Sequence, residues 1–127
     1  MSLPADDRDA LFKAFGRAFF RRDVDALYET VTDDFVWYTL DKDGNAKAVT
    51  GRDAVGAQLN QRSTTLENIR FEDVVYHHAD DATFMTFRLT ATNTETGNPH
   101  EDIGVERYTF RNGRIAVKDV YKKPNMF

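Results

Sequence analysis

The alternation of apolar and polar residues near the end of the chain predicts a β-hairpin over residues 102–121. Its turn lies at residues 111–114, Arg-Asn-Gly-Arg. Asn-Gly between two β-rich segments is the strongest short-range hairpin signal, because a type I′ turn needs positive φ at both central residues. A two-residue turn sets Glu106 opposite Asp119, and side chains alternate between the two faces of a strand. The pattern therefore places two carboxylates side by side on the more aromatic face, which also carries Tyr108.

Two alternatives to a facing acid pair remain open. Like charges directly opposed across a ribbon destabilise it, so a structural pair would need a cation between the carboxylates, or both acids would be solvated. A three-residue loop with a G1 bulge at Gly113 would shift the pairing by one residue and separate Glu106 from Asp119. We take the facing pair as the working hypothesis.

The rest of the pattern predicts helices before strands. Apolar residues at helical spacing between Ala10 and Phe19 predict a first helix, in which Gly16 suggests close packing against a neighbour. Asp23 can cap a short second helix, and a third runs from Asp53 to about residue 64. The expected β segments are residues 35–40, 66–78, 82–93, 101–110 and 114–122. Helices followed by a strand meander form an α+β domain with an antiparallel sheet, here one domain over residues 1–127.

The segment 82–93 indicates that both faces of this sheet are covered. Met85 and Phe87 lie on one of its faces, and Phe84 and Arg88 lie on the other. The helices can cover one face, and a second copy of the chain would cover the other, so we expect a homodimer. An arginine within a sheet face is usually paired. If Arg88 shares the face of the acid pair, it supplies the cation that the pair needs.

Composition narrows the possible partners and compartments. The chain has no Cys, which excludes disulfides and thiolate metal sites and fits a reducing compartment. Its net charge is -4, with acidic and basic residues mixed along the chain, so no nucleic-acid partner is expected. No apolar run is long enough for a signal peptide or a membrane span. We therefore expect a cytoplasmic protein with no membrane partner.

No metal or cofactor is expected either. Residues 41, 43 and 45 have the spacing of the first calcium ligands of an EF-hand, but Ala46 stands in place of the glycine and Arg52 in place of the bidentate glutamate. His77 and His78 are adjacent in a strand and point to opposite faces, so they cannot bind one metal together. His100 leaves a loop and is a surface residue or an auxiliary acid or base.

Several strings of the sequence resemble those of a known superfamily. They are residues 18–27 (AFFRRDVDAL), 31–35 (VTDDF), 51–55 (GRDAV) and 106–115 (ERYTFRNGRI). With the order of elements, they resemble the nuclear-transport-factor-2-like (NTF2-like) superfamily, in particular its SnoaL-like and ketosteroid-isomerase-like branch. The resemblance implies a cone-shaped fold, with N-terminal helices packed on a strongly curved antiparallel sheet, an internal pocket, and dimerisation through the sheet. It says little about function, because this scaffold hosts many activities.

The ketosteroid isomerases of this superfamily match the chain only in part. The place of their general base is held by Thr39, which cannot act as a base, and the place of their oxyanion-hole tyrosine is held by Phe15. Their second oxyanion donor, a protonated aspartate, matches Glu106. Steroid isomerisation by their mechanism is therefore not expected.

Limonene-type epoxide hydrolases also match in part. Their arginine corresponds to Arg88 and their last-strand aspartate to Asp119, which is also about where SnoaL-type cyclases keep an acid/base aspartate. Their intervening aspartate is Thr90 here, so the water-activating set is incomplete unless Glu106 substitutes.

Together these observations predict a cofactor-free acid–base enzyme of isomerase, cyclase or hydrolase type acting on a small apolar compound. Asp119 is the predicted base, Glu106 the partner that holds a proton, and Arg88 the electrostatic organiser. The predicted ligand-binding residues are Phe15, Phe19, Trp37, Thr39, Phe84, Tyr108 and Tyr121. Thr39 and Phe15 at two expected catalytic places support the alternative, a non-catalytic ligand-binding or accessory module.

Overall fold

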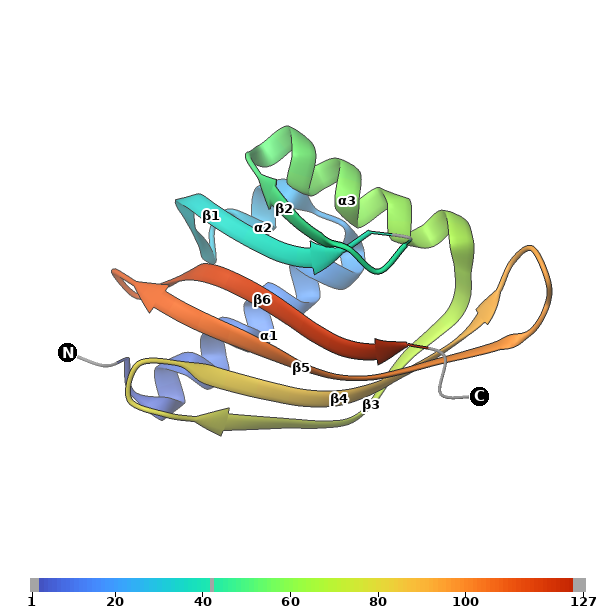
Figure 1. Ribbon diagram of the computed structural model, residues 1–127. Coiled ribbons are helices and arrows are strands. Elements are labelled where there is room, and N and C mark those ends of the chain that lie inside the picture. The colour runs from blue at the N-terminus through green and yellow to red at the C-terminus, as the bar shows by residue number, and fades with distance from the viewer. Residues whose placement is uncertain (1–2, 42, 125–127) are drawn as a thin grey trace.

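The computed structural model describes residues 3–41 and 43–124 of the chain (Figure 1). In chain order the elements of this part are α1 (Ala5–Arg21), α2 (Val24–Leu27), β1 (Val31–Leu40), β2 (Ala46–Thr50), α3 (Arg52–Thr65), β3 (Leu66–His78), β4 (Thr83–Asn93), β5 (Pro99–Arg111) and β6 (Arg114–Pro124). Helices α1, α2 and α3 pack on one curved, unclosed sheet, so the predicted α+β class is confirmed.

The sheet has the strand order β2-β1-β6-β5-β4-β3. Most neighbours are antiparallel, as predicted for this sheet, and one pair, β1 and β6, runs parallel. Strand β2 was not expected, because only Val49 of its five residues is buried and it carries no alternating apolar pattern. We call the face covered by the helices the inner face and the opposite face the outer face (Figure 1).

Helix α1 supplies the aromatic side chains that pack on the inner face. Phe12, Phe15 and Phe19 are spaced at three and four residues, so they lie on one side of the helix, and all three are buried. Arg22 adopts a left-handed conformation with φ 56° and ends the helix. A Cβ at Gly16 would meet no atom within 4 Å, so the close packing predicted at that glycine is wrong.

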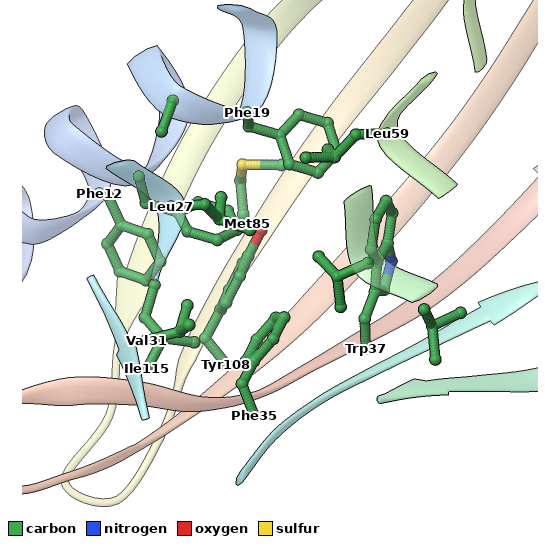
Figure 2. Close-up of a cluster of buried hydrophobic side chains, with 14 of the residues drawn as sticks. Phe12, Phe19, Leu27, Val31, Phe35, Trp37, Leu59, Met85, Tyr108 and Ile115 are labelled. Carbon is green, nitrogen blue, oxygen red and sulfur yellow. The ribbon is translucent and has the colours of Figure 1, made fainter. Parts of the chain in front are cut away.

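These side chains belong to a single aromatic-rich core between the helices and the sheet (Figure 2). The ring of Phe12 meets Tyr108 edge-on with centroids 4.8 Å apart, and Phe19 meets Trp37 at 5.3 Å. The core therefore joins α1 directly to β5 and to β1.

The β5–β6 hairpin has the predicted turn but not the predicted register. Asn112 and Gly113 have φ values of 54° and 77°, and Arg111 pairs with Arg114, as a type I′ turn requires. Two residues later β6 carries an extra residue, Ala116, between the pairs Phe110–Ile115 and Thr109–Val117. This β-bulge moves every later pair by one residue.

The bulge separates the two acids. Glu106 pairs with Val120, whereas Asp119 pairs with Arg107. Cross-strand partners share a face, so Glu106 lies on the inner face and Asp119 on the outer face. The predicted facing pair is therefore wrong, and the shift arises at Ala116 instead of at Gly113.

The side chains of β4 alternate between the two faces as predicted, but the set that faces inward is not the set that was predicted to line the pocket. Met85 and Phe87 are buried on the inner face. Phe84 and Arg88 lie on the outer face, since they alternate with these residues. The prediction that Phe84 and Arg88 face the pocket is therefore wrong.

Candidate functional site

A buried cluster of three polar side chains lies on the inner face of the hairpin. Lys118 Nζ donates to Glu106 Oε1 at 2.6 Å and to Tyr108 Oη at 3.0 Å, and the Tyr108 hydroxyl also donates to Glu106 Oε1. The three residues are only 2–5% exposed. Buried polar groups are stable when they satisfy one another in this way. The cluster is thus a closed carboxylate–ammonium–phenol unit in the core.

Both donors bind the same oxygen of Glu106. Lys118 and Tyr108 both donate to Oε1. A carboxylate can accept hydrogen bonds at both oxygens. The hydrogen bonds from Lys118 and Tyr108 thus converge on one oxygen of Glu106, a residue that lines both cavities described below.

Aromatic rings surround the ammonium group of Lys118. Its Nζ lies 4.9 Å from the ring centre of Phe19, 5.2 Å from Tyr108, 5.7 Å from Trp37 and 5.8 Å from Phe15. Ring faces attract cations at such distances, most strongly where water is excluded. Together with Glu106 they hold the positive charge of Lys118 inside the protein.

Two cavities adjoin this cluster. Glu106, Lys118, Phe19 and Phe71 line both of them. The first cavity, of about 100 Å³, extends toward Thr39, Phe87, Leu89, Asp102, Val120 and Lys122. The second, of about 150 Å³, is more apolar and extends toward Phe15, Val74, Tyr76, Met85 and Tyr108. A pocket of apolar walls with a few convergent polar groups is the usual form of a small-molecule site.

A second polar group lies at the far end of the first cavity. Asp102 is 2% exposed, and its Oδ2 is 3.0 Å from His100 Nε2 and 3.5 Å from Lys122 Nζ. Its other oxygen, Oδ1, has no hydrogen-bond partner within the described part of the chain. Sequence reasoning did not identify Asp102 or Lys122.

The structure brings together six of the ten residues predicted for the site. Phe15, Phe19, Trp37, Thr39, Tyr108 and Glu106 line the two cavities. Arg88, Asp119, Phe84 and Tyr121 lie on the outer face.

Arg88 is instead the centre of an ion-pair group on the outer face. It donates to Glu72 at 2.6 Å and lies 3.7 Å from Glu101. The hydrogen bond to Glu72 and the charges of Glu101, Glu72 and Asp73 raise the pKa of Arg88. Arg88 therefore remains a cation and links β3, β4 and β5 on the face opposite Glu106.

Asp119 has a similar outer-face role. It pairs with Arg107 across the hairpin and accepts a hydrogen bond of 2.8 Å from the Tyr121 hydroxyl. This bond is the main reason that the pKa of Tyr121 is raised, with the charge of Asp119 adding to it. Neither side chain lines the two inner cavities.

Lys118 is a further site residue that sequence reasoning did not find. A regular register places it opposite Arg107, on the outer face, where a lysine is unremarkable. The one unusual signal is its position between Val117 and Val120, within the strand rather than at its end.

The other two histidines, His77 and His78, line neither cavity. His78 lies 3.0 Å from Asp9 and 2.9 Å from the Thr83 hydroxyl, and His77 lies 3.3 Å from the Thr86 hydroxyl. Within residues 3–41 and 43–124, no three or more His, Asp or Glu side chains are grouped closely enough to hold a metal ion.

Comparison with known proteins identifies the family. The sequence model of the SnoaL-like domain matches residues 12–118, so the chain belongs to the SnoaL-like domain family. The NTF2-like superfamily predicted from the sequence is thereby confirmed. A comparison with curated proteins gave no match.

Solved structures with the same fold are distant in sequence. An NTF2-like protein of Burkholderia xenovorans superposes with a TM-score of 0.81 at 19% identity, over 94% of this chain and 92% of that one. A proposed polyketide cyclase of Xanthomonas campestris superposes with a TM-score of 0.73 at 19% identity, over 91% of this chain and 90% of that one. A Catenulispora acidiphila protein with a ketosteroid isomerase-like fold was solved in complex with trimethylamine. It superposes with a TM-score of 0.69 at 16% identity, over 87% of this chain and 83% of that one. These matches establish the fold.

In the described part of the chain, no helix combines the length and the apolar character that crossing a membrane requires.

Proposed function

We propose that this protein binds a small apolar compound and catalyses a cofactor-free acid–base reaction on it, of isomerase, cyclase or hydrolase type. The observation that carries the proposal is the Glu106–Lys118–Tyr108 cluster, which adjoins two cavities and directs both of these donors to Glu106 Oε1. The proposed polyketide cyclase among the structural relatives is consistent with such chemistry.

Each member of the cluster has a distinct role in this proposal. Glu106 Oε2 accepts a proton from carbon next to a ligand carbonyl, or from an enol, and returns it at a second position. Lys118 carries the nearby positive charge that stabilises negative charge developing on the ligand oxygen. Tyr108 holds Oε1 in place with Lys118, so that Oε2 remains directed at the ligand. Glu106 thus takes the role of base that the sequence assigned to Asp119.

Exchange of α-protons tests this proposal without knowledge of the natural substrate. The probe is 2-tetralone, an apolar ketone, incubated with the protein in deuterium oxide and followed by proton NMR. We expect the wild type to accelerate exchange, and Glu106→Gln to lower the protein-dependent rate by about 100-fold or more. Asp119→Asn changes the same type of side chain on the other face and should leave the rate unchanged. Full exchange by Glu106→Gln would overturn the assignment of the base.

A non-catalytic binding module is the second candidate function. It is favoured by the pairing of Glu106, because a carboxylate held by an ammonium at 2.6 Å and by a phenol can be purely structural. This alternative requires that 2-tetralone binds, as judged by quenching of Trp37 fluorescence, while exchange remains at the rate of buffer. Binding of this kind should survive Glu106→Gln.

We also propose that the outer face of the sheet joins two copies of the chain in a homodimer. The helices lie on the inner face (Figure 1), and large apolar side chains on the outer face are exposed. They are Tyr38, Val75, Ile103 and Tyr121. Large apolar side chains exposed on one face of a sheet are typical of a protein interface.

A further inference from the structure

The end of the first cavity opposite Lys118 is built around a buried carboxylate. Asp102 is almost fully buried, and both of its polar neighbours, His100 and Lys122, approach Oδ2. Oδ1 is left without a partner among the described residues. An acceptor buried without a donor costs folding free energy, so such a group indicates a missing partner.

A second unpartnered group belongs to the wall of the same cavity. Trp37 is 3% exposed, and its indole Nε1 has no acceptor within residues 3–41 and 43–124. Trp37 neighbours Lys118 across the β1–β6 pair, at the Glu106 end of the cavity. The cavity wall therefore offers a donor near one end and an acceptor at the other.

The residues that line the first cavity also include the apolar side chains of Phe87 and Leu89. Asp102 and Glu106 lie four residues apart on β5, a separation of about 13 Å between their Cα atoms. Gly104 lies midway, and a Cβ there would meet the Phe87 ring at 2.6 Å. The missing side chain thus lets Phe87 pack directly on the strand, between the two carboxylates. A planar apolar ligand would lie against this ring.

We propose that Asp102 is a second anchoring point for the ligand and that it accepts a hydroxyl or N–H group from the end remote from the reacting oxygen. The ligand is then an elongated, largely aromatic compound, with a carbonyl or enol at the Glu106–Lys118 end and a hydrogen-bond donor at the Asp102 end. Because His100 and Lys122 both hold Oδ2, Oδ1 is the oxygen that accepts a hydrogen bond from the ligand. This inference rests on the proposed function, because it assumes that the cavity binds an apolar carbonyl compound.

Two ketones of the same shape test the proposed anchor. 6-Hydroxy-2-acetonaphthone can donate a hydrogen bond at the end remote from its carbonyl, whereas 6-methoxy-2-acetonaphthone cannot. Trp37, the single tryptophan of the chain, lines the cavity, so quenching of its fluorescence measures binding of either compound. We expect the hydroxy compound to bind the wild type about tenfold more tightly than the methoxy compound. This comparison requires no variant and is therefore independent of any effect on folding.

Two variants then locate the effect. Asp102→Asn should remove most of the tenfold preference, whereas Asp119→Asn, on the outer face, should keep it. Equal affinity for the two ketones in the wild type would overturn the anchor and leave the proposed function standing. A preference that survives in Asp102→Asn would also overturn it, since the donor would then bind elsewhere. Absence of quenching by both ketones would count against the binding pocket itself, and so against both proposals.

Discussion

Lys118 and Glu106 form an ion pair of 2.6 Å on the inner face of the sheet, although a regular hairpin would place them on opposite faces. The extra residue at Ala116 turns Lys118 inward, where it lies diagonal to Glu106 and directly opposite Tyr108. Both side chains of the pair are no more than 6% exposed. An ion pair this deeply buried depends on both of its members.

Removing only the lysine should therefore destabilise the fold strongly. We expect Lys118→Met to lower the free energy of unfolding by about 3–5 kcal/mol, because it leaves the Glu106 carboxylate buried without its cation. The double variant Lys118→Met/Glu106→Gln should recover part of this loss. Urea unfolding measures the free energy of unfolding of both variants. The control is Lys123→Met on the exposed outer face, for which we expect a change near zero. A loss below 1 kcal/mol for Lys118→Met would show that the pair is not closed in solution.

Gly104 should not tolerate a side chain. A Cβ at this position would lie 2.6 Å from Phe87 Cζ and 2.9 Å from the backbone oxygen of Tyr121. We expect Gly104→Ala to cost about 1–3 kcal/mol of stability, measured by urea unfolding. Gly16→Ala is the matched control: it has free space around it in α1 and should stabilise the helix by up to about 1 kcal/mol. Equal effects of the two substitutions would contradict the packing of Phe87 on β5.

Arg8 should be essential for joining α1 to the β3–β4 turn. It is 3% exposed and donates to the backbone oxygens of Leu3, Ala79, Asp80 and Ala82 and to the Thr83 hydroxyl. Lysine keeps the charge but cannot reach all of these acceptors. Arg8→Lys should lower the free energy of unfolding by about 2–4 kcal/mol, whereas Arg17→Lys, at an exposed position of the same helix, should change it little. Thermal unfolding distinguishes the two variants.

The titration of Tyr76 should report the charge of Glu106. Burial raises the pKa of Tyr76, and the charges of Glu106 and Asp9 raise it further. A pKa that is higher in the folded state contributes stability that is fully present below the unfolded value of about 10 and is lost as pH rises through the folded value. We therefore expect stability to fall above pH 10, and the fall to be smaller in Tyr76→Phe.

Absorbance at 295 nm checks the same assignment directly. The difference between wild type and Tyr76→Phe isolates the titration of this phenol. Glu106→Gln should move that titration to lower pH, because it removes one of the charges that oppose phenolate formation. An unchanged Tyr76 titration in this variant would show that Glu106 is uncharged or more distant.

The homodimer proposal predicts an effect of charge on the outer face. Tyr121 is 56% exposed there, and Tyr38 on neighbouring β1 is 44% exposed. Light scattering after size exclusion should give twice the 14.6 kDa mass of the chain for the wild type and a monomer for Tyr121→Glu. The control is Lys13→Glu, which changes the charge at an exposed position of α1. Tyr76 is not used for this purpose because its ring stacks on Phe12 in the core. A wild-type monomer at micromolar concentration would reject the proposal.

The sequence predicted the elements of this fold better than the faces of its strands. Asn112-Gly113 specified the turn, because few other pairs adopt positive φ twice in succession. Apolar periodicity that includes Phe15 and Phe19 predicted α1. Both signals are local, and each depends on a few neighbouring residues.

The errors have a common physical origin, since strand alternation defines two faces but does not state which one is inside. Phe84 and Phe87 are equally apolar, and only the position of the buried core decides which of them lies inside. The bulge at Ala116 leaves no clear mark in composition, because alanine suits either a regular strand or an irregular one. Lys118 could therefore be identified only after the register was known.

The extra residue in β6 also affects how function can be transferred between members of this family. The extra residue at position 116 shifts every later pair by one, so it decides which set of side chains the last strand turns to the inner face. A relative without it would present the counterparts of Val117, Asp119 and Tyr121 to its pocket, and an alignment by residue order would conceal the exchange. Catalytic assignments on the last strand of SnoaL-like proteins therefore need to be made by side-chain direction, one structure at a time.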